Sequence, residues 1–280
     1  MTLRASRSVQ LILIVCLSLF SCVEERRDPT PVAETTWARV NKAHRLRVGY
    51  ILFPPAVVKD PQTGVLGGHF VATVREIARQ AGWSTEFVAT DWSTFTAGLN
   101  TGKFDVSIAP TFVTIPRATA VGFSRPLFYA GNSAIVKKGE TRFDSLPSLN
   151  RAEVRLAVTQ GEAGYEFAKQ NLTHAQLIIH PGPDQSLTFS DVLSGRADAA
   201  LGDAYATSQF AAAHPDANDL FARRPYNLTP VSWAVATDDV RLLQFMNDAI
   251  EALDSQGKLL EYEHAAGAHW LHNERKLEVQ

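Results

Sequence analysis

The sequence predicts an α/β protein built from two similar doubly wound lobes. Short apolar runs alternate with stretches of helical spacing along most of the chain, which is the pattern of strands and helices around a parallel sheet. The two halves also share a local pattern, at residues 99–105 and 193–198, in which a leucine, a glycine, a basic residue and an aspartate close a helix and open a strand. Two lobes that direct their strand ends toward one crevice are expected to bind a small molecule between them.

The first half is predicted to alternate as strand, helix, strand, helix, strand. Two prolines after Phe53 force an extended loop, and a glycine-rich turn follows. Apolar residues at helical spacing between Val71 and Ala81 then indicate a helix that ends at Gly82. The expected elements are strands at 46–50, 85–89 and 106–109 and helices at 71–81 and 93–99.

The second half repeats the alternation and then returns to the first. Its expected elements are strands at 133–137, 154–159, 176–180 and 199–201 and helices at 164–170 and 187–193. A further strand over residues 231–236 takes the chain back, and a final helix should pack on the first lobe through Val240, Leu243, Met246, Ala249, Ile250 and Leu253. The predicted lobes are therefore residues 45–131 with 231–280, and residues 132–230.

Composition limits the function classes. The chain has 280 residues and a net charge of −2, which suits one or two globular domains and offers no basic surface for nucleic acid. The sequence contains no nucleophile elbow, phosphate-binding loop or dinucleotide fingerprint, so we expect neither a cofactor nor covalent catalysis. His264, His269 and His272 match no common metal-ligand spacing, and we expect no metal site.

The N-terminus has the pattern of an export signal. Basic residues precede an apolar run over residues 11–20 that is too short for a stable membrane anchor and ends at Cys22, like the lipobox of bacterial lipoproteins. We expect a signal peptide over residues 1–22, lipidation of Cys22 and a tether over residues 23–44, with the protein in the periplasm or cell envelope. An uncleaved anchor and plain secretion are the alternatives. The other cysteine, Cys16, lies within the signal, so the mature chain relies on its hydrophobic core.

The turn after the third strand carries the first candidate site residue. Thr114 suits an N-cap and Pro116 tolerates a first helical turn, so Arg117 is expected at the start of a helix and at the carboxyl end of a strand, where ligands of open α/β sheets bind. A guanidinium beside free helix N–H groups suits a carboxylate. A surface ion pair is the alternative for Arg117. Five places after the aspartate of each half come two more candidates, Pro110 and Asp203.

An ordered set of short stretches covers nearly the whole mature chain: Leu46-Arg47-Val48-Gly49, Phe53-Pro54-Pro55, Gly102-Lys103-Phe104-Asp105, Thr114-Ile115-Pro116-Arg117, Phe123-Ser124-Arg125-Pro126-Leu127, Gln160-Gly161 and Gly195-Arg196-Ala197-Asp198-Ala199. From residue 46 to about 270 the chain thereby resembles family 3 of the bacterial extracellular solute-binding proteins, the polar amino-acid type. The resemblance implies a type II periplasmic-binding-protein fold, with two lobes joined by two hinge strands that close on a ligand. It further implies a monomer that delivers an amino acid, or a similar small carboxylate and amine, to an ABC permease in the membrane.

The resemblance also implies polar roles for individual residues. Arg117 matches the arginine that pairs with the α-carboxylate of the ligand, and Asp203 matches the acid that accepts its α-ammonium. Pro110 would offer its carbonyl to the ammonium and Phe112 its N–H to the carboxylate. The alternative for Asp203 is a helix N-cap at the strand end.

The same resemblance implies an aromatic enclosure for the ligand. Phe53 and Trp92 match the positions whose rings enclose the aliphatic part of the ligand. For Trp92, which follows an aspartate, a place in the hydrophobic core is an equal alternative.

Two departures from the family pattern bear on the ligand. At the position of Phe112 the family usually has a hydroxyl residue. After Gly161 it usually has a threonine, where this chain has Glu162. We also place the next residue, Ala163, at the ligand. A second acid near a carboxylate ligand is unfavourable unless it is protonated, turned outward or paired with a cation, so we hypothesise a ligand with an additional cationic or hydroxyl group. The alternative is that Glu162 favours the helix dipole and faces solvent. The first loop lacks the aspartate of many basic-amino-acid binders, which weakens the case for a basic ligand.

Two other function classes stay open. The fold also includes periplasmic cyclohexadienyl dehydratases, whose general acid falls at Ala206 here, a residue with no proton to give. Glu162 could replace that acid only if burial raised its pKa toward the working pH. The third class is a sensory module, a lipid-anchored clamp that presents its closed form to a receptor instead of a permease.

Overall fold

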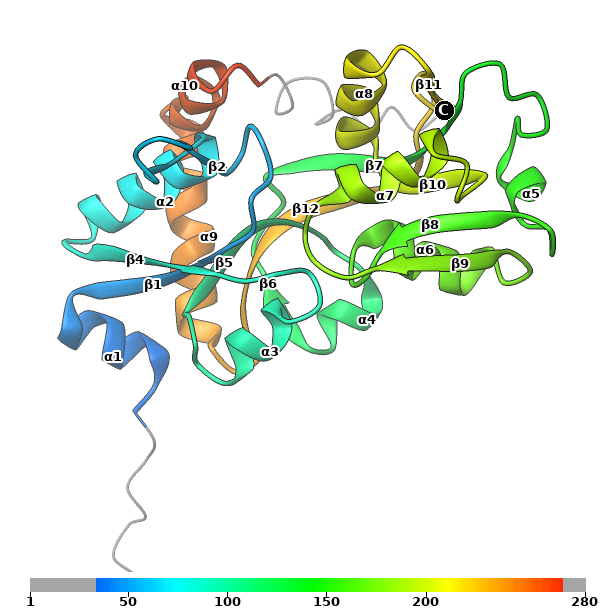
Figure 1. Ribbon diagram of the computed structural model, residues 1–280. Helices are drawn as coiled ribbons and strands as arrows, with labels where there is room; N and C mark the ends of the chain where they lie inside the picture. The colour runs from blue at the N-terminus through cyan, green and yellow to red at the C-terminus, as the bar shows by residue number, and fades with distance from the viewer. Residues whose placement is uncertain (1–33, 269–280) are drawn as a thin grey trace, which may run out of the picture. The chain divides into compact units, whose positions relative to one another are not determined.

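Strands and helices alternate through residues 34–268, the part of the chain that this computed structural model describes (Figure 1). The expected signal peptide, Cys22 and the histidines at 269 and 272 lie outside the described residues. The strands are β1 (Arg45–Tyr50), β2 (Val58–Lys59), β3 (Leu66–Gly67), β4 (Ser84–Ala89), β5 (Val106–Phe112), β6 (Val121–Phe123), β7 (Phe128–Lys137), β8 (Arg155–Thr159), β9 (Gln176–His180), β10 (Ala199–Asp203), β11 (Ala217–Asp219) and β12 (Tyr226–Ala236). The helices are α1 (Thr36–Ala43), α2 (His69–Gln80), α3 (Phe95–Asn100), α4 (Ile115–Ala118), α5 (Leu146–Leu149), α6 (Ala163–Asn171), α7 (Gln185–Leu193), α8 (Ala204–Ala213), α9 (Val240–Ser255) and α10 (Lys258–Ala265).

The main sheet contains one strand arrangement twice. Parallel strands run in the order β4-β1-β5 at one end and β9-β8-β10 at the other, so the first strand of each triplet lies between the second and the third. Antiparallel strands follow, β12 beside β5 and β7 beside β10, and β12 and β7 pair with each other (Figure 1). We call the elements around the first triplet lobe 1 and those around the second lobe 2. The prediction of two doubly wound lobes joined by two crossing strands is confirmed.

Each lobe has its own apolar core. In lobe 1, α2 and α9 bury their apolar faces against β1, β5 and β12. In lobe 2 the sheet has one cluster on each face, one including α6 and the other including α7 and α8. Continuous apolar runs form these central parallel strands because both of their faces are covered. Fully buried examples are Val48, Ile108, Phe70 and Trp233 in lobe 1 and Leu156, Leu201 and Phe189 in lobe 2.

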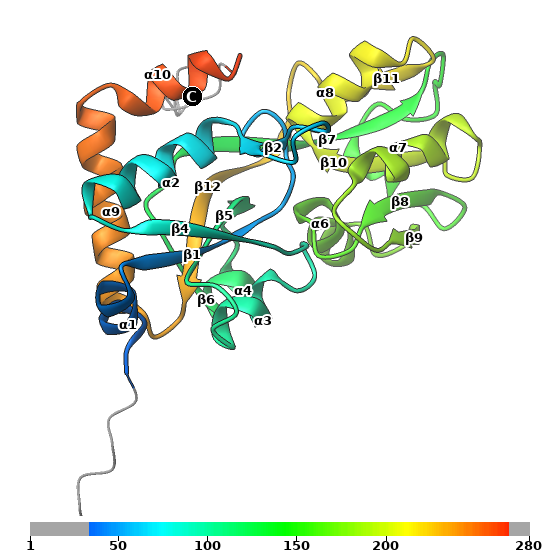
Figure 2. The same cartoon turned by 60° about the vertical axis from the view of Figure 1, so that its left-hand side comes forward.

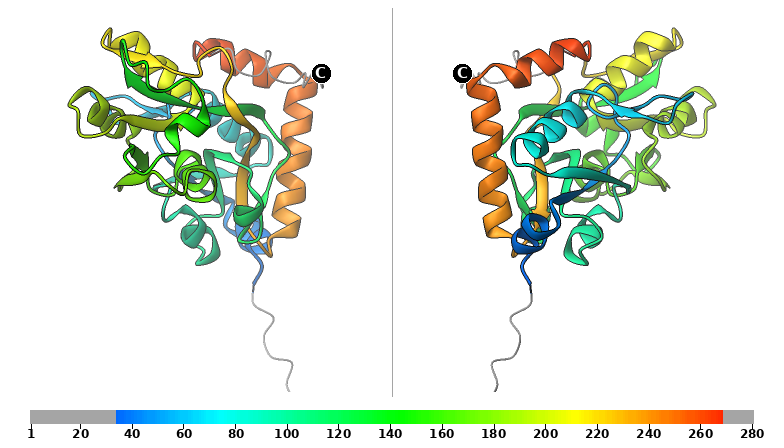
Figure 3. Two further views of the ribbon diagram at one scale, coloured as in Figure 1. Left: turned by 90° about the vertical axis from the view of Figure 1, so that its right-hand side faces the viewer. Right: turned by 90° about the vertical axis from the view of Figure 1, so that its left-hand side faces the viewer.

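The helix α9 packs on lobe 1 as expected (Figures 2 and 3), and Leu243 and Ala249 pack partly buried against its core. Met246, Ile250 and Leu253 are buried as expected, whereas Leu242 is fully buried and Val240 is 69% exposed. The buried residues follow one another at intervals of four, four and three, so the stripe extends back through Leu242 and passes beside Val240 at the helix start. Among residues 34–268 no helix is long and apolar enough to cross a membrane.

The expected tether over residues 23–44 is wrong for residues 36–43, which form α1. Thr35 caps this helix by accepting a hydrogen bond from the N–H of Ala38 at 3.1 Å. Val40 is fully buried, and the Trp37 ring packs against Trp83 with centroids 5.7 Å apart. One short helix that buries few residues gives too little periodicity to be found from sequence, and its stability comes from packing on lobe 1.

An aspartate ties the first and third strands of lobe 1 together. The N–H of Asp105 donates to the carbonyl of Arg47 at 2.8 Å, and its carboxylate accepts from the N–H of Arg47, also at 2.8 Å. The guanidinium groups of Arg47 and of Arg39 on α1 reach the same carboxylate at 2.6 Å and 2.7 Å. We call Asp105, Arg47 and Arg39 the lobe 1 cluster.

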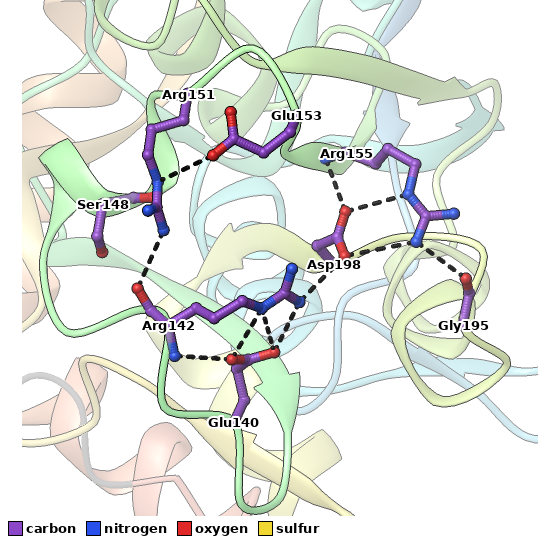
Figure 4. Close-up of polar contacts among 8 residues, drawn as sticks. All are labelled: Glu140, Arg142, Ser148, Arg151, Glu153, Arg155, Gly195 and Asp198. Carbon is purple, nitrogen blue, oxygen red and sulfur yellow. Dashed lines mark hydrogen bonds and ion pairs between the residues drawn. The ribbon is translucent and has the colours of Figure 1, made fainter.

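Lobe 2 repeats this arrangement at the second copy of the sequence pattern. The N–H of Asp198 donates to the carbonyl of Arg155 at 2.9 Å, and its carboxylate accepts from the N–H and from Nε of Arg155, both at 3.0 Å. Arg142 approaches the carboxylate at 3.1 Å and also binds Glu140, as Figure 4 shows. We call Asp198, Arg155 and Arg142 the lobe 2 cluster. The pattern that closes a helix and opens a strand is thus explained, because its aspartate fastens the new strand to the first strand of the lobe.

Candidate functional site

Arg117 lies where the sequence places it, after β5 and on the short helix α4. Thr114 caps this helix, with its hydroxyl 3.4 Å from the N–H of Arg117. The guanidinium donates from Nη1 to the carbonyl of Phe112 at 2.9 Å and from Nη2 to the carbonyl of Gly161 at 2.6 Å. Since Gly161 belongs to lobe 2, Arg117 joins the two lobes directly. A guanidinium has five N–H donors, so this arrangement leaves donors for a further acceptor.

Gly161 also brings the backbones of the two lobes together. Its φ of +79° lies in the left-handed region, and a Cβ at this position would lie 2.6 Å from the backbone oxygen of Trp92 in lobe 1. Only glycine fits both the conformation and the contact. Gly161 belongs to one of the family patterns in the sequence, but its role does not show there because its contact partner is distant in the chain.

Asp203 ends β10 and caps α8. Its carboxylate accepts from the N–H of Ala206 at 2.9 Å and from Nε2 of Gln185 at 2.9 Å, and the residue is buried. Burial raises the pKa of Asp203 above its usual value, against these hydrogen bonds. The N-cap interpretation is therefore correct, and it leaves acceptor capacity on a carboxylate that has about four lone-pair sites.

Glu162 is the N-cap of α6, as the helix-dipole alternative held, but that alternative is wrong in placing the side chain in solvent. The residue is 4% exposed, and its Oε2 accepts from the N–H of Gly164 at 2.7 Å. Burial raises the pKa of Glu162 to about 7, the negative charge of Asp203 adds to this effect, and Arg117 opposes it. Burial of the Glu162 carboxylate is tolerated because it accepts hydrogen bonds from helix N–H groups that would otherwise lack a partner.

The predicted aromatic residues occupy different surroundings. Trp92 is 6% exposed, packs with Ile51 and Ala109, and borders a cavity of about 340 Å³ that Arg117 also lines. Its Nε1 is buried without a hydrogen-bond partner among residues 34–268. The ring of Phe53 faces Tyr205 of lobe 2 at 6.4 Å between centroids. Trp92 is thus largely a core residue, and Phe53 contacts the opposite lobe.

A second cavity, of about 260 Å³, brings together the other candidates. Phe53, Pro110, Phe112 and Asp203 line it. Val113 donates its N–H to the carbonyl of Pro230 on β12. Because an antiparallel ladder alternates, the backbone groups of Phe112 point away from β12.

The two cavities are linked through Arg117, which lines the first and binds the carbonyl of Phe112 in the second. Glu162 and Ala163 are not among the residues that line either cavity; both are buried at the start of α6, and Ala163 packs in the lobe 1 core cluster. Sequence reasoning also missed Tyr205 and Gln185. The sequence feature that could have indicated them is a position in the first turn of a helix, α8 for Tyr205 and α7 for Gln185. Both lie close to Asp203 in the structure.

Charged side chains gather near the contact between the lobes. Glu162 interacts electrostatically with both Arg117 and Asp203, and a guanidinium and carboxylates of this kind can pair with groups of either sign. Residues 34–268 contain no group of three or more His, Cys, Asp or Glu side chains that could hold a metal ion.

Comparisons with known sequences find related proteins. Residues 46–265 match the sequence model of the bacterial extracellular solute-binding proteins, family 3. A probable amino-acid ABC transporter-binding protein of Haemophilus influenzae is 28% identical over 222 residues, 79% of this chain and 84% of that protein. The lysine/arginine/ornithine-binding periplasmic protein of Escherichia coli is 26% identical over 211 residues, 73% and 80% of the two chains. A cyclohexadienyl dehydratase of Pseudomonas aeruginosa is 23% identical over 179 residues, 64% and 66% of the two chains.

Solved structures show the same fold. The ancestral amino acid-binding protein AncCDT-1, described as a precursor of cyclohexadienyl dehydratase, is 27% identical with a TM-score of 0.72, and the match covers 82% of this chain and 99% of that one. An ancestral arginine-binding protein bound to arginine is 28% identical with a TM-score of 0.69, covering 79% and 97%.

Proposed function

Because the chain belongs to the bacterial extracellular solute-binding proteins of family 3, we propose that it captures an amino acid, or a similar small molecule with a carboxylate and an amine, between its two lobes and delivers it to an ABC transporter. Opposite charges at the lobe contact carry the proposal. Arg117 follows β5 in lobe 1, and Asp203 ends β10 in lobe 2. A zwitterion that binds both would connect the lobes, so binding and closure would be one event.

The remaining candidates support this arrangement. The proposed roles are a carboxylate partner for Arg117, an ammonium partner for Asp203, backbone contacts from Pro110 and Phe112, and ring contacts from Phe53 and Trp92. The carbonyl of Phe112, in the same lobe, accepts from Arg117 and fixes its orientation before ligand arrives. No covalent step is needed for capture and release, and we propose a monomer.

The proposed location is the periplasm or cell envelope, with the chain held to the membrane by a lipid on Cys22. This part of the proposal rests on the sequence pattern of residues 1–22. Metabolic labelling with a radioactive fatty acid tests it: we expect label in the wild-type protein and none in Cys22→Ala.

Thermal unfolding against a panel of amino acids tests the binding function. A ligand at about 100 times its Kd adds about 2.7 kcal/mol to the unfolding free energy, which for this chain length raises Tm by several degrees. We expect one ligand class to raise Tm in the wild type and to lose this effect in Arg117→Ala and in Asp203→Ala. A panel without any shift would contradict the proposal.

A second candidate function has one observation in its favour. Burial raises the pKa of Glu162 to about 7, and a general acid works best with a pKa near the operating pH. The chain is also similar to a cyclohexadienyl dehydratase. Against this candidate, Ala206 stands at the position matched to the general acid of those enzymes. Incubation with prephenate or arogenate separates the two functions: we expect the substrate to remain intact, and its loss, abolished in Glu162→Gln, would favour the enzyme.

A further inference from the structure

A third cavity, of about 560 Å³, shares Phe53 and Tyr205 with the cavity that Asp203 lines. Lobe 1 contributes the loop after β1, with Leu52, Phe53 and Pro54, and lobe 2 contributes the start of α7 and one face of α8. We call it the apolar cavity. A group that fills it touches both lobes, so its binding favours the closed arrangement of the lobes.

The walls of the apolar cavity are mostly aromatic. In addition to Phe53 and Tyr205, the rings of Phe189 and Phe210 line it, and these two pack edge to face with centroids 5.2 Å apart. Leu52 is 46% exposed at this place, so the cavity offers apolar surface that the chain itself leaves uncovered. Aromatic side chains pack on a further ring through their faces and edges, which makes such a cavity suited to an aromatic group.

The apolar cavity reaches the residue that we propose for the ligand's ammonium group. Gln185 lines it and donates from Nε2 to the carboxylate of Asp203 at 2.9 Å, and Ala206 lines it and donates its N–H to the same carboxylate, also at 2.9 Å. Because Nε2 of Gln185 is used in this way, its amide has a fixed orientation, and Oε1 is buried without a hydrogen-bond partner within residues 34–268. Buried polar atoms without partners are rare in folded proteins. An ammonium has three N–H donors, so one that binds Asp203 can also supply the donor that Oε1 lacks.

The apolar cavity offers little to a charged side chain. The carboxylate among its lining residues in the described part of the chain, Asp184, is exposed and caps α7 by accepting from the N–H of Ser186 at 2.9 Å. Water screens a pairing with an exposed carboxylate, so a cation would gain little there. An aromatic ring, by contrast, gains in proportion to the apolar surface that it removes from water.

We propose that the apolar cavity is the side-chain subsite of the ligand, so that the protein binds amino acids with an aromatic side chain more tightly than small or cationic ones. This inference rests on the proposed binding function and adds a ligand class to it. Arg117 and Asp203 bind the two charges that all amino acids share. Selection among amino acids then depends on how much of the apolar cavity the side chain fills.

Isothermal titration of the wild-type protein with L-phenylalanine and with L-alanine tests the inference, because the two ligands differ by one phenyl ring. Burial of an aromatic side chain corresponds to about tenfold or more in Kd, so we expect L-phenylalanine to bind at least about tenfold more tightly. L-Lysine is the third ligand, since its side chain is long but ends in a charge. We expect it to bind more weakly than L-phenylalanine.

Two variants on neighbouring residues locate the subsite. Ala212 and Ala213 are both exposed on α8, and Ala213 lines the apolar cavity whereas Ala212 does not. Ala213→Trp places a large ring at the cavity, and we expect it to weaken binding of L-phenylalanine by about tenfold and to leave binding of L-alanine unchanged. The matched control, Ala212→Trp, should change neither. An unchanged affinity of Ala213→Trp for L-phenylalanine, or an equal loss for both ligands, would refute the assignment of the subsite.

The outcomes also distinguish this inference from the proposed function. If L-alanine or L-lysine binds the wild type as tightly as L-phenylalanine, the inference is overturned and amino-acid capture stands. Absence of binding by any amino acid overturns both. The comparison of ligands on the wild type requires no substitution, so the inference is tested even if Ala213→Trp folds poorly.

Discussion

The lobe 1 cluster and the lobe 2 cluster have the same backbone geometry but different exposure to water. In lobe 1 the side chain of Asp105 is fully buried, and those of Arg47 and Arg39 are 21% and 34% exposed. In lobe 2 the side chain of Asp198 is 12% exposed, and those of Arg155 and Arg142 are 42% and 51% exposed. One sequence pattern therefore gives one set of hydrogen bonds, while the free energy they contribute depends on what covers them. In lobe 1 the helix α1 supplies Arg39 and helps to cover the cluster.

The largest effect is expected from Asp105→Ala. It leaves Arg47 and Arg39 without their shared carboxylate and the N–H of Arg47 without an acceptor. Breaking a buried ion pair by removing one partner costs about 3–5 kcal/mol, so Tm should fall by about 10 °C. Thermal and urea unfolding measure this. A loss below about 1 kcal/mol would show that water reaches the cluster after all.

A smaller effect is expected from Asp198→Ala, at about 1–2 kcal/mol, because water can solvate the half-exposed Arg155 and Arg142. Burial raises the pKa of Asp198, but hydrogen bonds from Arg155 and Arg142 outweigh this and hold it below its usual value. A lowered folded-state pKa stabilises the protein above the unfolded value of about 4 and ceases to do so as the pH falls further. The stability difference between wild type and Asp198→Ala should therefore shrink toward pH 3. If Asp198→Ala and Asp105→Ala lowered the free energy of unfolding equally, the two clusters would not differ in their contribution to stability.

The smallest effects are expected from the outer arginines. Arg39→Met should lower the free energy of unfolding by about 1 kcal/mol, and Arg142→Met by no more than about 0.5 kcal/mol. Arg142 is the more exposed of the two, and a surface ion pair contributes little to stability. Double-mutant cycles with Asp105→Asn and Asp198→Asn measure each pair directly. A larger coupling energy for Arg142 than for Arg39 would reverse the comparison.

The sequence carries most of the fold because its signals are local. Both triplets of parallel strands, the crossing strands and the final helix follow from apolar runs and helical spacing. The helix α1 was missed because its core-facing residues, the partly buried Trp37 and the buried Val40, are too few to form a pattern. The ring of Trp37 packs on Trp83 and Phe245, which lie far away in the chain. Val240 was assigned to the buried face because spacing alone does not show where the core ends.

The candidate site was less accessible to sequence reasoning. Arg117 and Asp203 could be placed because strand ends and helix caps have local signals. The burial of Glu162 and the contact of Gly161 with Trp92 depend on the approach of the two lobes. No short stretch of the sequence includes residues from both sides of that contact. Orientation between lobes is decided by packing between distant segments, so it emerges only in the assembled structure.

The interleaving of the chain between the lobes has a consequence for the order of folding. The triplet β8, β9 and β10 forms within about fifty residues, so its contacts close short loops. By contrast, β5 pairs with β12 across about 120 residues of intervening chain. Lobe 2 can therefore assemble first, while β5 keeps an unpaired edge until β12 arrives. Refolding experiments should accordingly find that hydrogen exchange protection appears in β8 and β10 before it appears in β5.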